Sequence, residues 1–369
     1  MGLSAPRTVR STELASLSEL VDQVFFGEPG AEMFCRFPQL FNAGNIDNLY
    51  VITDGSTVIS HVGTMRRWAS IAGCTVRVAC VGAVATAEAY RNQGLASQLL
   101  EFACRQGKED GLDFMLISGG RGLYRRYGAA DVGRNYLTVL TRSHAAAIAV
   151  GDVAVDTFDR AYLAPCQAAY HRKTARFIRP RDDWESFLSC GYCMNRRSEI
   201  VYVTHRDIFA GYFVVAAEEG GHARILEYAG EDTVLAGALQ ALMERQSAAR
   251  LELIIEGPDR GFGKMLAQAG CSFEFVPAEG TLILLNFPQL THRLRPYFEA
   301  KAGHDKADSL RFVEKEGRYY FGVKGAEKIR EGKRAAAEFL FGNPATPPPD
   351  NALGEILPAP TLHYGLNYV

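Results

Sequence analysis

An apolar run from Val81 to Thr86, in which β-branched residues recur, predicts a buried strand. After a short polar segment, apolar residues return at helical spacing and predict an amphipathic helix that begins near Leu95. The apolar face of this helix consists of Leu95, Leu99, Leu100, Phe102 and Ala103. This part of the chain is therefore predicted to run as strand, turn and helix.

The turn before this helix has the sequence Arg91-Asn92-Gln93-Gly94-Leu95-Ala96-Ser97. A glycine-containing turn at a helix N-terminus offers unpaired N–H groups and a positive helix end, and both suit an anion. The turn lacks the lysine of a P-loop and the glycine spacing of a dinucleotide-binding turn. It is therefore either an anion-binding turn of another kind or a plain connection with a solvated arginine.

A second apolar strand, Phe114 to Ser118, leads into Gly119 and Gly120, and Gly122-Leu123-Tyr124-Arg125-Arg126-Tyr127-Gly128-Ala129 follows. The Arg-x-x-Gly-x-Ala turn resembles motif A of the GCN5-related N-acetyltransferase (GNAT) superfamily. The strand, the short helix with Leu-Tyr and the later glycine resemble motif B. The resemblance implies an α/β fold built on a mixed sheet, with acetyl-CoA as co-substrate and no metal.

The resemblance also implies a role for individual residues. The turn from Arg91 to Ser97 would hold the pyrophosphate of acetyl-CoA, and the backbone of Val84, Ala85 and Thr86 would pair with the pantetheine arm. Gly119 and Gly120 would lie close to the cofactor. Tyr124 falls on the general-acid tyrosine, since a phenol with a pKa of about 10 can donate its proton to a departing thiolate. Core packing is the alternative interpretation of Tyr124.

Helical patterns over Ser11 to Phe26 and Glu32 to Phe41 precede this region. They carry the aromatic residues Phe25, Phe26, Phe34, Phe37 and Phe41, which form either a helix–helix core or one side of an acceptor pocket. Strands are predicted at Leu49–Thr53, Val58–Trp68 and Thr75–Thr86, and a closing strand at Tyr136–Leu140. His61 on the second strand is either a structural residue or a base that faces the acceptor.

From about Gly151 the same order of elements begins again more faintly. The segment at the place of the pyrophosphate turn is Tyr228-Ala229-Gly230-Glu231-Asp232-Thr233. Its two carboxylates would repel a phosphate, so this second copy is predicted to have lost its cofactor site. A shorter last segment, from about Pro288, resembles a sterol-carrier-like domain.

The predicted architecture is thus two tandem GNAT-like folds, the second degenerate, and a small sterol-carrier-like domain, with domains at 1–147, 148–288 and 289–369. This arrangement resembles the enhanced intracellular survival protein family. The resemblance implies acetylation of a primary amine on a small cationic molecule, such as an aminoglycoside or a polyamine, or on a lysine side chain. It also implies a homo-oligomer, a hexamer in that family. It further implies that the C-terminal carboxylate, here on Val369, serves as the base; packing of a final strand is the plainer alternative.

Composition and charge argue against some classes of protein but do not indicate a function. The 369-residue chain has a net charge of −2, which gives no basic field for nucleic acid. No apolar run has the length of a membrane span and the first residues lack a signal-peptide core, so a cytoplasmic protein without a membrane partner is expected. The eight cysteines are scattered, and the lone pair Cys190 and Cys193 has no second pair to complete a zinc site. A non-catalytic protein that binds acyl-CoA or lipid remains the alternative function.

Overall fold

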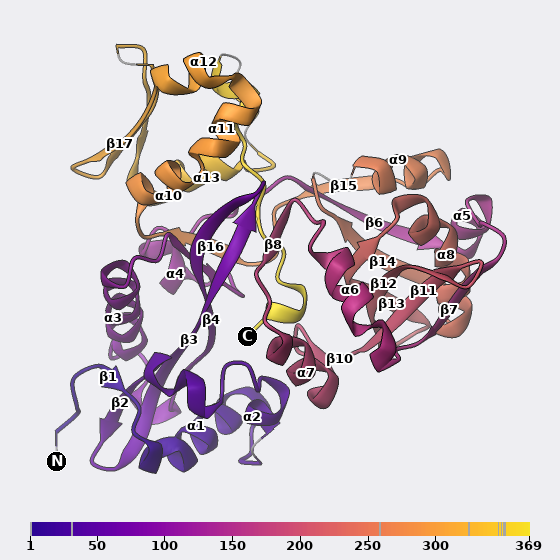
Figure 1. Cartoon of the computed structure of the whole chain (residues 1–369). Helices are drawn as coiled ribbons and strands as arrows, with labels where there is room; N and C mark the ends of the chain where they lie inside the picture. The colour runs from indigo at the N-terminus through magenta and orange to yellow at the C-terminus, as the bar shows by residue number, and fades with distance from the viewer. Residues whose placement is uncertain are drawn as a thin grey trace.

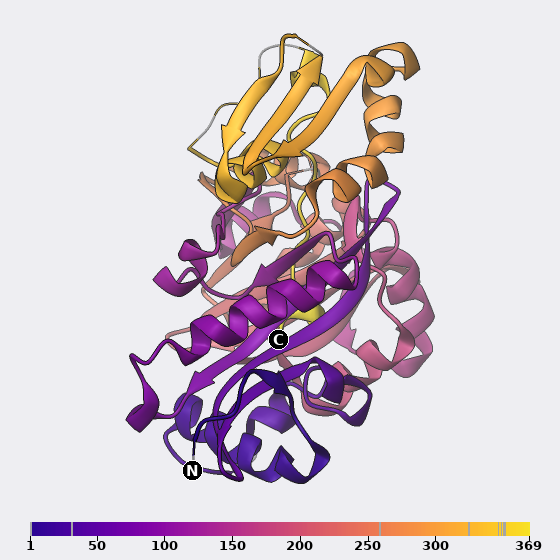
Figure 2. The same cartoon turned by 90° about the vertical axis from the view of Figure 1, so that its left-hand side faces the viewer.

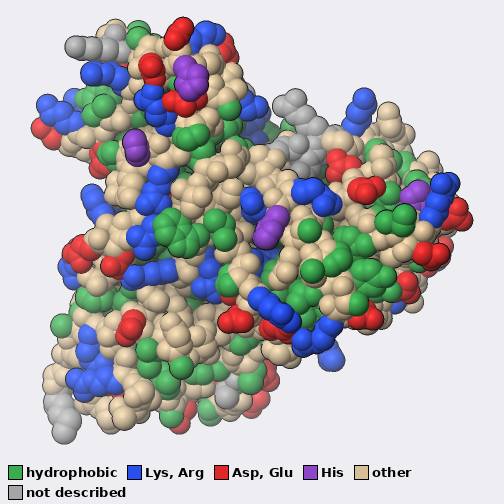
Figure 3. All heavy atoms as spheres, in the orientation of Figure 1, with side chains coloured by type: hydrophobic (Ala, Val, Ile, Leu, Met, Phe, Trp, Pro, Cys, Tyr) green, Lys and Arg blue, Asp and Glu red, His purple; other side chains and the backbone are tan. Residues whose placement is uncertain are grey.

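The computed structural model describes residues 2–30, 32–257, 260–323, 325–345, 347, 349 and 352–369. The chain forms three units, each with its own sheet (Figure 1). The third unit sits above the first in this view, and the second lies beside them. The space-filling view of the same face shows acidic and basic side chains scattered over all three units, with a notch between the first and the second (Figure 3).

The first sheet has the strand order β1-β2-β3-β4-β5-β16. Its neighbours are antiparallel except β4 and β5, which are parallel and are connected through helix α3. The elements are β1 (Arg7–Thr8), β2 (Leu49–Asp54), β3 (Thr57–Ile71), β4 (Cys74–Thr86), β5 (Phe114–Ile117), β16 (Thr281–Leu284), α1 (Leu14–Phe26), α2 (Glu32–Arg36), α3 (Leu95–Glu109) and α4 (Gly122–Arg126).

Helices cover both faces of this sheet, because side chains alternate between two cores along each strand. In β4, Val81 packs with Leu99 and Leu100 of α3, whereas its neighbour Cys80 belongs to the core that contains Leu17 of α1. Figure 2 shows α3 lying along one face of the sheet. The α/β fold with a mixed sheet is therefore confirmed.

The second sheet has the order β15-β6-β14-β13-β12-β11-β7 and repeats the pattern of the first. Its antiparallel strands β11, β12 and β13 are followed by a helix, α8, and by a strand, β14, that is parallel to β13. The elements are β6 (Asn135–Thr141), β7 (Val153–Thr157), β11 (Glu199–His205), β12 (Ile208–Glu218), β13 (His222–Gly230), β14 (Arg250–Ile255), β15 (Phe273–Val276), α5 (Arg142–Ala147), α6 (Leu163–Tyr170), α7 (Arg181–Cys190), α8 (Asp232–Arg245) and α9 (Arg260–Gln268). From this part of the chain, β8 (Ala175–Phe177) joins the first sheet by pairing with β3, and β9 (Tyr192–Cys193) forms a hairpin with β10 (Arg196–Arg197).

The strand predicted at Tyr136–Leu140 exists, but its expected place in the first sheet is wrong. This strand, β6, pairs with β14 and β15 of the second sheet, and the first sheet is instead closed by β16, which pairs with β5. Each sheet thus takes a strand from the other's stretch of sequence. A local pattern of apolar residues predicts a strand, but it carries no information about the strand's distant partner. The division into domains at residues 147 and 288 stays a prediction.

The first helices also differ from the prediction at their ends. Helix α2 ends at Arg36 rather than near Phe41, because Pro38 disfavours the helical conformation for the residue before it. Ser11, where the helical pattern begins, lies in a 3₁₀ turn, and the α-helix itself begins at Leu14. The Glu13 side chain accepts the backbone N–H of Arg10 at 2.9 Å there, and it pairs with Arg7.

The third unit consists of a three-stranded sheet and four helices. The strands are β17 (Leu310–Lys315), β18 (Arg318–Val323) and β19 (Lys328–Glu331), and the helices are α10 (Phe287–Arg293), α11 (Arg295–Ala302), α12 (His304–Ser309) and α13 (Gly332–Phe341). After this unit the chain runs back between the first and second units, where it ends (Figure 1). Leu362, Tyr364, Leu366 and Val369 are all buried along this final segment. The tail is therefore part of the core between the two sheets.

Candidate active site

The parallel strands β4 and β5 part in the middle of the first sheet. Their pairing ends at Val81 and Ile117, whereas β4 continues to Thr86 with β3 on its other side. The register of β3 against β4 shifts between His61 and Gly63, opposite Ala83, which has a φ of +51°. A bulge of this kind re-aims the strand. The parting leaves room beside residues 82–86 for an extended ligand.

The predicted pantetheine-pairing residues lie on this stretch. Val84 lines the cavity described below. Ala85 is buried in the core of the first unit, and its carbonyl accepts a hydrogen bond from Ser60 at 3.1 Å. The hydroxyl of Thr86 lies 2.8 Å from that of Ser60. The side chains of Ala85 and Thr86 are thus engaged with the first unit, and a ligand would meet this strand through its backbone.

His61 supports the bulge and does not line the cavity. Its Nδ1 lies 2.7 Å from the carbonyl oxygen of Ala83, and its side chain is completely buried. Burial lowers the pKa of His61 to about 4, although the hydrogen bond with Ala83 opposes part of that shift. At neutral pH the imidazole is therefore uncharged, and its Nδ1–H donates to Ala83. The structural interpretation of His61 fits this environment better than the role of a base.

The pKa of His61 predicts acid sensitivity. Because the pKa in the folded state lies below the reference value of about 6.5, the unfolded chain binds the proton more readily, and stability is lost as pH falls from about 6.5 towards 4. The loss between pH 7 and pH 5 is expected to be about 2 kcal/mol. In His61→Asn, whose amide can still donate to Ala83, this part of the pH dependence should vanish. Urea unfolding at the two pH values measures it, and an equal slope in both proteins would contradict the assignment.

The predicted pyrophosphate turn lies at the end of β4 and is open to solvent. Arg91, Asn92, Gln93 and Gly94 are exposed, and α3 begins at Leu95 without a side-chain cap. Asn92 and Gly94 have φ values of +64° and +77°. The backbone N–H groups of the first helical turn have no acceptor within the helix. The Arg91 guanidinium donates to the carbonyl of Thr86 at 3.3 Å, and it therefore lies at the end of β4.

Beyond β5, a short loop and helix α4 bring the predicted general acid to the cavity. Gly119, Arg121 and Tyr124 line it, and Gly120 is exposed beside them. A Cβ on Gly119 would lie 3.6 Å from the Tyr124 ring, so that ring packs directly against the loop. Tyr124 is 5% exposed, and burial raises the pKa of its phenol. The phenol therefore keeps its proton at neutral pH.

Val369 ends in the same cavity. It is buried, and a Cβ on Gly82 would overlap its carboxyl group, with the carbonyl oxygen of Val369 at 2.6 Å. Only a residue without a side chain fits at position 82 while the tail holds this place. The carboxyl end of the chain thus rests on the strand that carries Ala83 and Val84.

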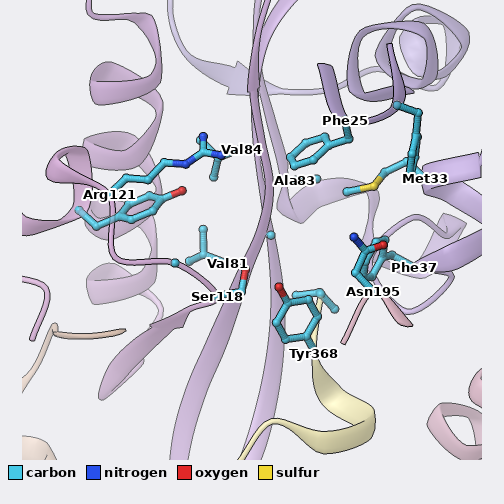
Figure 4. Close-up of a pocket in the computed structure, with 15 residues that line it drawn as sticks. Phe25, Met33, Phe37, Val81, Ala83, Val84, Ser118, Arg121, Asn195 and Tyr368 are labelled. Atoms are coloured by element: carbon cyan, nitrogen blue, oxygen red, sulfur yellow. The ribbon is translucent and has the colours of Figure 1, made fainter. Parts of the chain in front are cut away.

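The cavity has a volume of about 180 Å³ and spans the two sides of β4. Figure 4 shows Arg121, Val84 and Ser118 on one side of the strand and Phe25, Met33 and Phe37 on the other, with Tyr368 directed in from the tail. Its lining residues are Phe25, Phe26, Met33, Phe37, Val81, Gly82, Ala83, Val84, Ser118, Gly119, Arg121, Tyr124, Asn195, Tyr368 and Val369.

The predicted aromatic wall divides into two parts. Phe25, Phe26 and Phe37 line the cavity, whereas Phe34 and Phe41 stack on each other with ring centroids 4.2 Å apart. Sequence reasoning did not find Met33, Ser118, Arg121, Asn195 or Tyr368 as lining residues. Tyr368 had a usable signal, since it is adjacent to Val369. Asn195 had none, because it reaches the cavity from the hairpin between β9 and β10, far away in the sequence.

A buried polar network holds the tail in place. The guanidinium of Arg179 forms a bidentate ion pair with Glu227 at 3.0 and 2.8 Å, and its Nε donates to Oδ1 of Asn367 at 2.9 Å. Glu227 also accepts the Tyr212 hydroxyl at 2.6 Å and the backbone N–H of Leu366 at 3.0 Å. Burial alone would raise the pKa of Glu227, but the charge and hydrogen bonds of Arg179, together with these two hydrogen bonds, outweigh it and the pKa lies below its ordinary value.

The network continues into the first unit. The side-chain amide of Asn367 donates to Asp183 at 3.2 Å, and Asp183 pairs with Arg67 of β3 at 2.6 Å. Gln39 donates to the carbonyl of Leu366 at 3.0 Å. The last residues are therefore fixed between the two sheets by groups from both of them, just before the chain enters the cavity.

Asn367→Ala tests this anchor. Asn367 is completely buried, so the loss of its two hydrogen bonds is expected to destabilise the protein by about 1–3 kcal/mol. If the tail carries a reacting group, kcat should also fall by about tenfold or more while the affinity for acetyl-CoA stays unchanged. Asn343→Ala, which removes a bond to the Asp131 carbonyl outside the cavity, is the matched control. Equal kcat values in the two variants would show that the anchor has no part in catalysis.

The turn of the second unit carries two acidic residues at the place where the first unit has the turn from Arg91 to Ser97. Glu231 and Asp232 stand where β13 passes into α8, and the carboxylate of Asp232 accepts the backbone N–H of Phe262 in α9 at 3.1 Å. An anionic side chain thus lies at this helix N-terminus. It disfavours a bound phosphate there, as the sequence predicts.

No helix in the described part of the chain is long and apolar enough to cross a membrane. Among the same residues, no group of three or more His, Cys, Asp or Glu side chains is arranged to hold a metal ion.

Comparisons with known proteins agree with this geometry. Residues 5–131 match the model of the acetyltransferase (GNAT) domain family. No curated protein matches the sequence. The matched range, residues 5–131, contains β4, the turn, α3, β5 and α4. It therefore includes Tyr124 and the strand and turn that are predicted to bind acetyl-CoA.

Solved structures share the fold of nearly the whole chain. A GCN5-related N-acetyltransferase from Kribbella flavida aligns over 100% of both chains with a TM-score of 0.68 and 16% identity. One from Anabaena variabilis covers 90% of this chain and 86% of its own, with a TM-score of 0.63 and 13% identity. Eis1 from Mycobacterium abscessus covers 90% and 85%, with a TM-score of 0.59 and 14% identity. Residues 5–131 are therefore a GNAT acetyltransferase domain, and the protein is an acyltransferase.

Proposed function

We propose that the protein is an acetyl-CoA-dependent N-acetyltransferase that transfers the acetyl group directly to a primary amine. The observation that carries this proposal is the meeting of Tyr124, Val369 and the open edge of β4 in one cavity. Acetyl-CoA would lie with its pyrophosphate on the N–H groups of the turn from Arg91 to Ser97 and its pantetheine arm along residues 84–86.

In the proposed reaction, the amine nitrogen attacks the thioester carbonyl carbon, the C–N bond forms, and the C–S bond breaks. The ammonium proton leaves to the Val369 carboxylate, directly or through water, before or during the attack. The thiolate of CoA takes the proton of the Tyr124 hydroxyl. The nitrogen loses its second proton as the amide forms, and this proton returns to Tyr124 through solvent. Backbone N–H groups of the bulged strand at Ala83 and Val84 would stabilise the negative charge on the carbonyl oxygen.

The second unit is proposed to be a GNAT-like fold without a cofactor site, followed by a sterol-carrier-like third unit. The repeated pairing order and the carboxylate at the second turn support the first part. In this view the second unit serves the first, since Arg179, Asp183 and Glu227 hold the tail and Asn195 lines the cavity.

One experiment distinguishes the proposed acetyl transfer from the alternative function, which is binding of acyl-CoA or lipid without turnover. Calorimetry measures acetyl-CoA binding, and release of the CoA thiol is then followed across a panel of primary amines. We expect binding together with amine-dependent thiol release. Binding without release with any amine would favour the non-catalytic alternative.

A further inference from the structure

The side of the cavity that faces away from the cofactor turn is apolar. Phe25 and Phe26 come from the end of α1, Met33 from α2, and Phe37 from the turn that follows it. The Tyr368 ring lies 6.3 Å from that of Phe37, measured between centroids, and its hydroxyl is directed towards the strand in Figure 4. This wall would therefore present aromatic rings and a thioether to the acceptor molecule.

Negative charge is scarce in the same cavity. Among its lining residues, Arg121 has the only charged side chain, and the terminal carboxylate of Val369 is the only anion. Two acidic residues of the first helices, Asp22 and Glu32, have other partners. Asp22 accepts the backbone N–H groups of Gly30 and Met33 at 3.1 and 2.9 Å, and Glu32 pairs with Arg36.

The second unit closes the cavity without adding a carboxylate. Asn195, at the tip of the hairpin between β9 and β10, has a φ of +58° and accepts a hydrogen bond from Arg36 at 3.5 Å. Arg36 is stacked between the rings of Phe26 and Tyr192, at 4.4 and 4.7 Å from their centroids. The rim beside the apolar wall therefore carries a cation held between aromatic rings.

The scarcity of negative charge bears on the number of positive charges that an acceptor can bring. Each further ammonium group that entered the cavity would lose water without meeting a carboxylate among the lining side chains.

From the lining and the charge we propose that the acceptor is an arylalkylamine: a primary amine with one positive charge, on a chain that ends in an aromatic ring. This proposal rests on the proposed acetyltransferase function and narrows its substrate. The ring would pack among Phe25, Phe37 and Met33, while the amine would face Val369 and the thioester. A polycation, by contrast, is disfavoured.

The test compares three amines with the full chain and acetyl-CoA: 2-phenylethylamine, spermidine and kanamycin. The expected kcat/KM for thiol release with 2-phenylethylamine is about 100-fold or more above those with the two polycations. A kcat/KM for spermidine or kanamycin equal to or above that value would overturn the substrate class and leave the acetyltransferase function standing. If acetyl-CoA binds but no amine releases thiol, the proposed function fails, and the substrate class fails with it.

A charge-introducing variant sharpens the comparison. Phe25 lines the cavity yet is 41% exposed, so Phe25→Glu should fold and place a carboxylate at the wall. The ratio of kcat/KM for spermidine to that for 2-phenylethylamine is expected to rise about tenfold. Val139→Glu, at a 42% exposed position of β6 in the second sheet, is the matched control and should leave the ratio unchanged. An unchanged ratio in Phe25→Glu would show that the wall does not contact the acceptor.

Discussion

Replacing Tyr124 by phenylalanine is expected to lower kcat by about 100-fold or more, because the departing thiolate of CoA loses its proton donor. The ring packs beside Gly119 and is almost fully buried, so phenylalanine should keep the shape of the cavity. The affinity for acetyl-CoA should therefore stay within about twofold of the native value. Steady-state thiol release and calorimetry measure the two quantities.

A buried tyrosine elsewhere provides the control for Tyr124. Tyr319 in the third unit is 2% exposed, and its hydroxyl donates to Glu314 at 3.3 Å. Tyr319→Phe removes a buried hydroxyl without touching the cavity, and its kcat should be unchanged. A native kcat in Tyr124→Phe, with the amine concentration saturating, would remove the general acid from the mechanism.

Lengthening the chain by two glycines after Val369 is expected to lower kcat by about 100-fold, while acetyl-CoA binding is retained. The carboxylate now rests against Gly82, and there it would be replaced by a neutral peptide group. The base would be lost or moved out of reach of the amine. Full activity in the extended protein would show that the terminal carboxylate takes no part in the reaction.

The variant Gly82→Ala, on strand β4, tests the position of the Val369 carboxyl group in a second way. A methyl group at position 82 would overlap the carboxyl group of Val369, so either the tail or β4 must shift. We expect a loss of kcat that resembles that of the extended chain. Gly30→Ala, where a Cβ meets nothing within 4 Å, should behave as the native protein. Equal activity in both glycine variants would contradict the placement of the tail.

The cofactor side of the site could be predicted from the sequence because it is local. Strand, turn, helix and the following strand lie in one stretch from Val81 to Gly128, and periodicity together with the turn chemistry is sufficient to place them. The structure puts Val84, Gly119 and Tyr124 at one cavity, with the exposed turn at the end of the same strand. Their roles towards acetyl-CoA remain predictions.

The acceptor side could be predicted only in part, because it is assembled from distant segments. The aromatic residues of the first helices were found from helical spacing. Phe37 and Phe41 both pack in the core, and the pattern could not show that Phe37 also lines the cavity. Asn195 enters through a two-residue hairpin turn of the second unit. The exchange of β6 and β16 between the sheets likewise depends on pairing between strands more than 100 residues apart, which no local pattern encodes.

The most direct test of the account is amine-dependent release of the CoA thiol by the native chain and by the chain extended after Val369, measured with 2-phenylethylamine and with acetyl-CoA binding followed in parallel. The account predicts equal binding in both proteins, turnover in the native chain, and a kcat about 100-fold lower in the extended one. Binding without turnover in the native chain, or equal turnover in both chains, would contradict it.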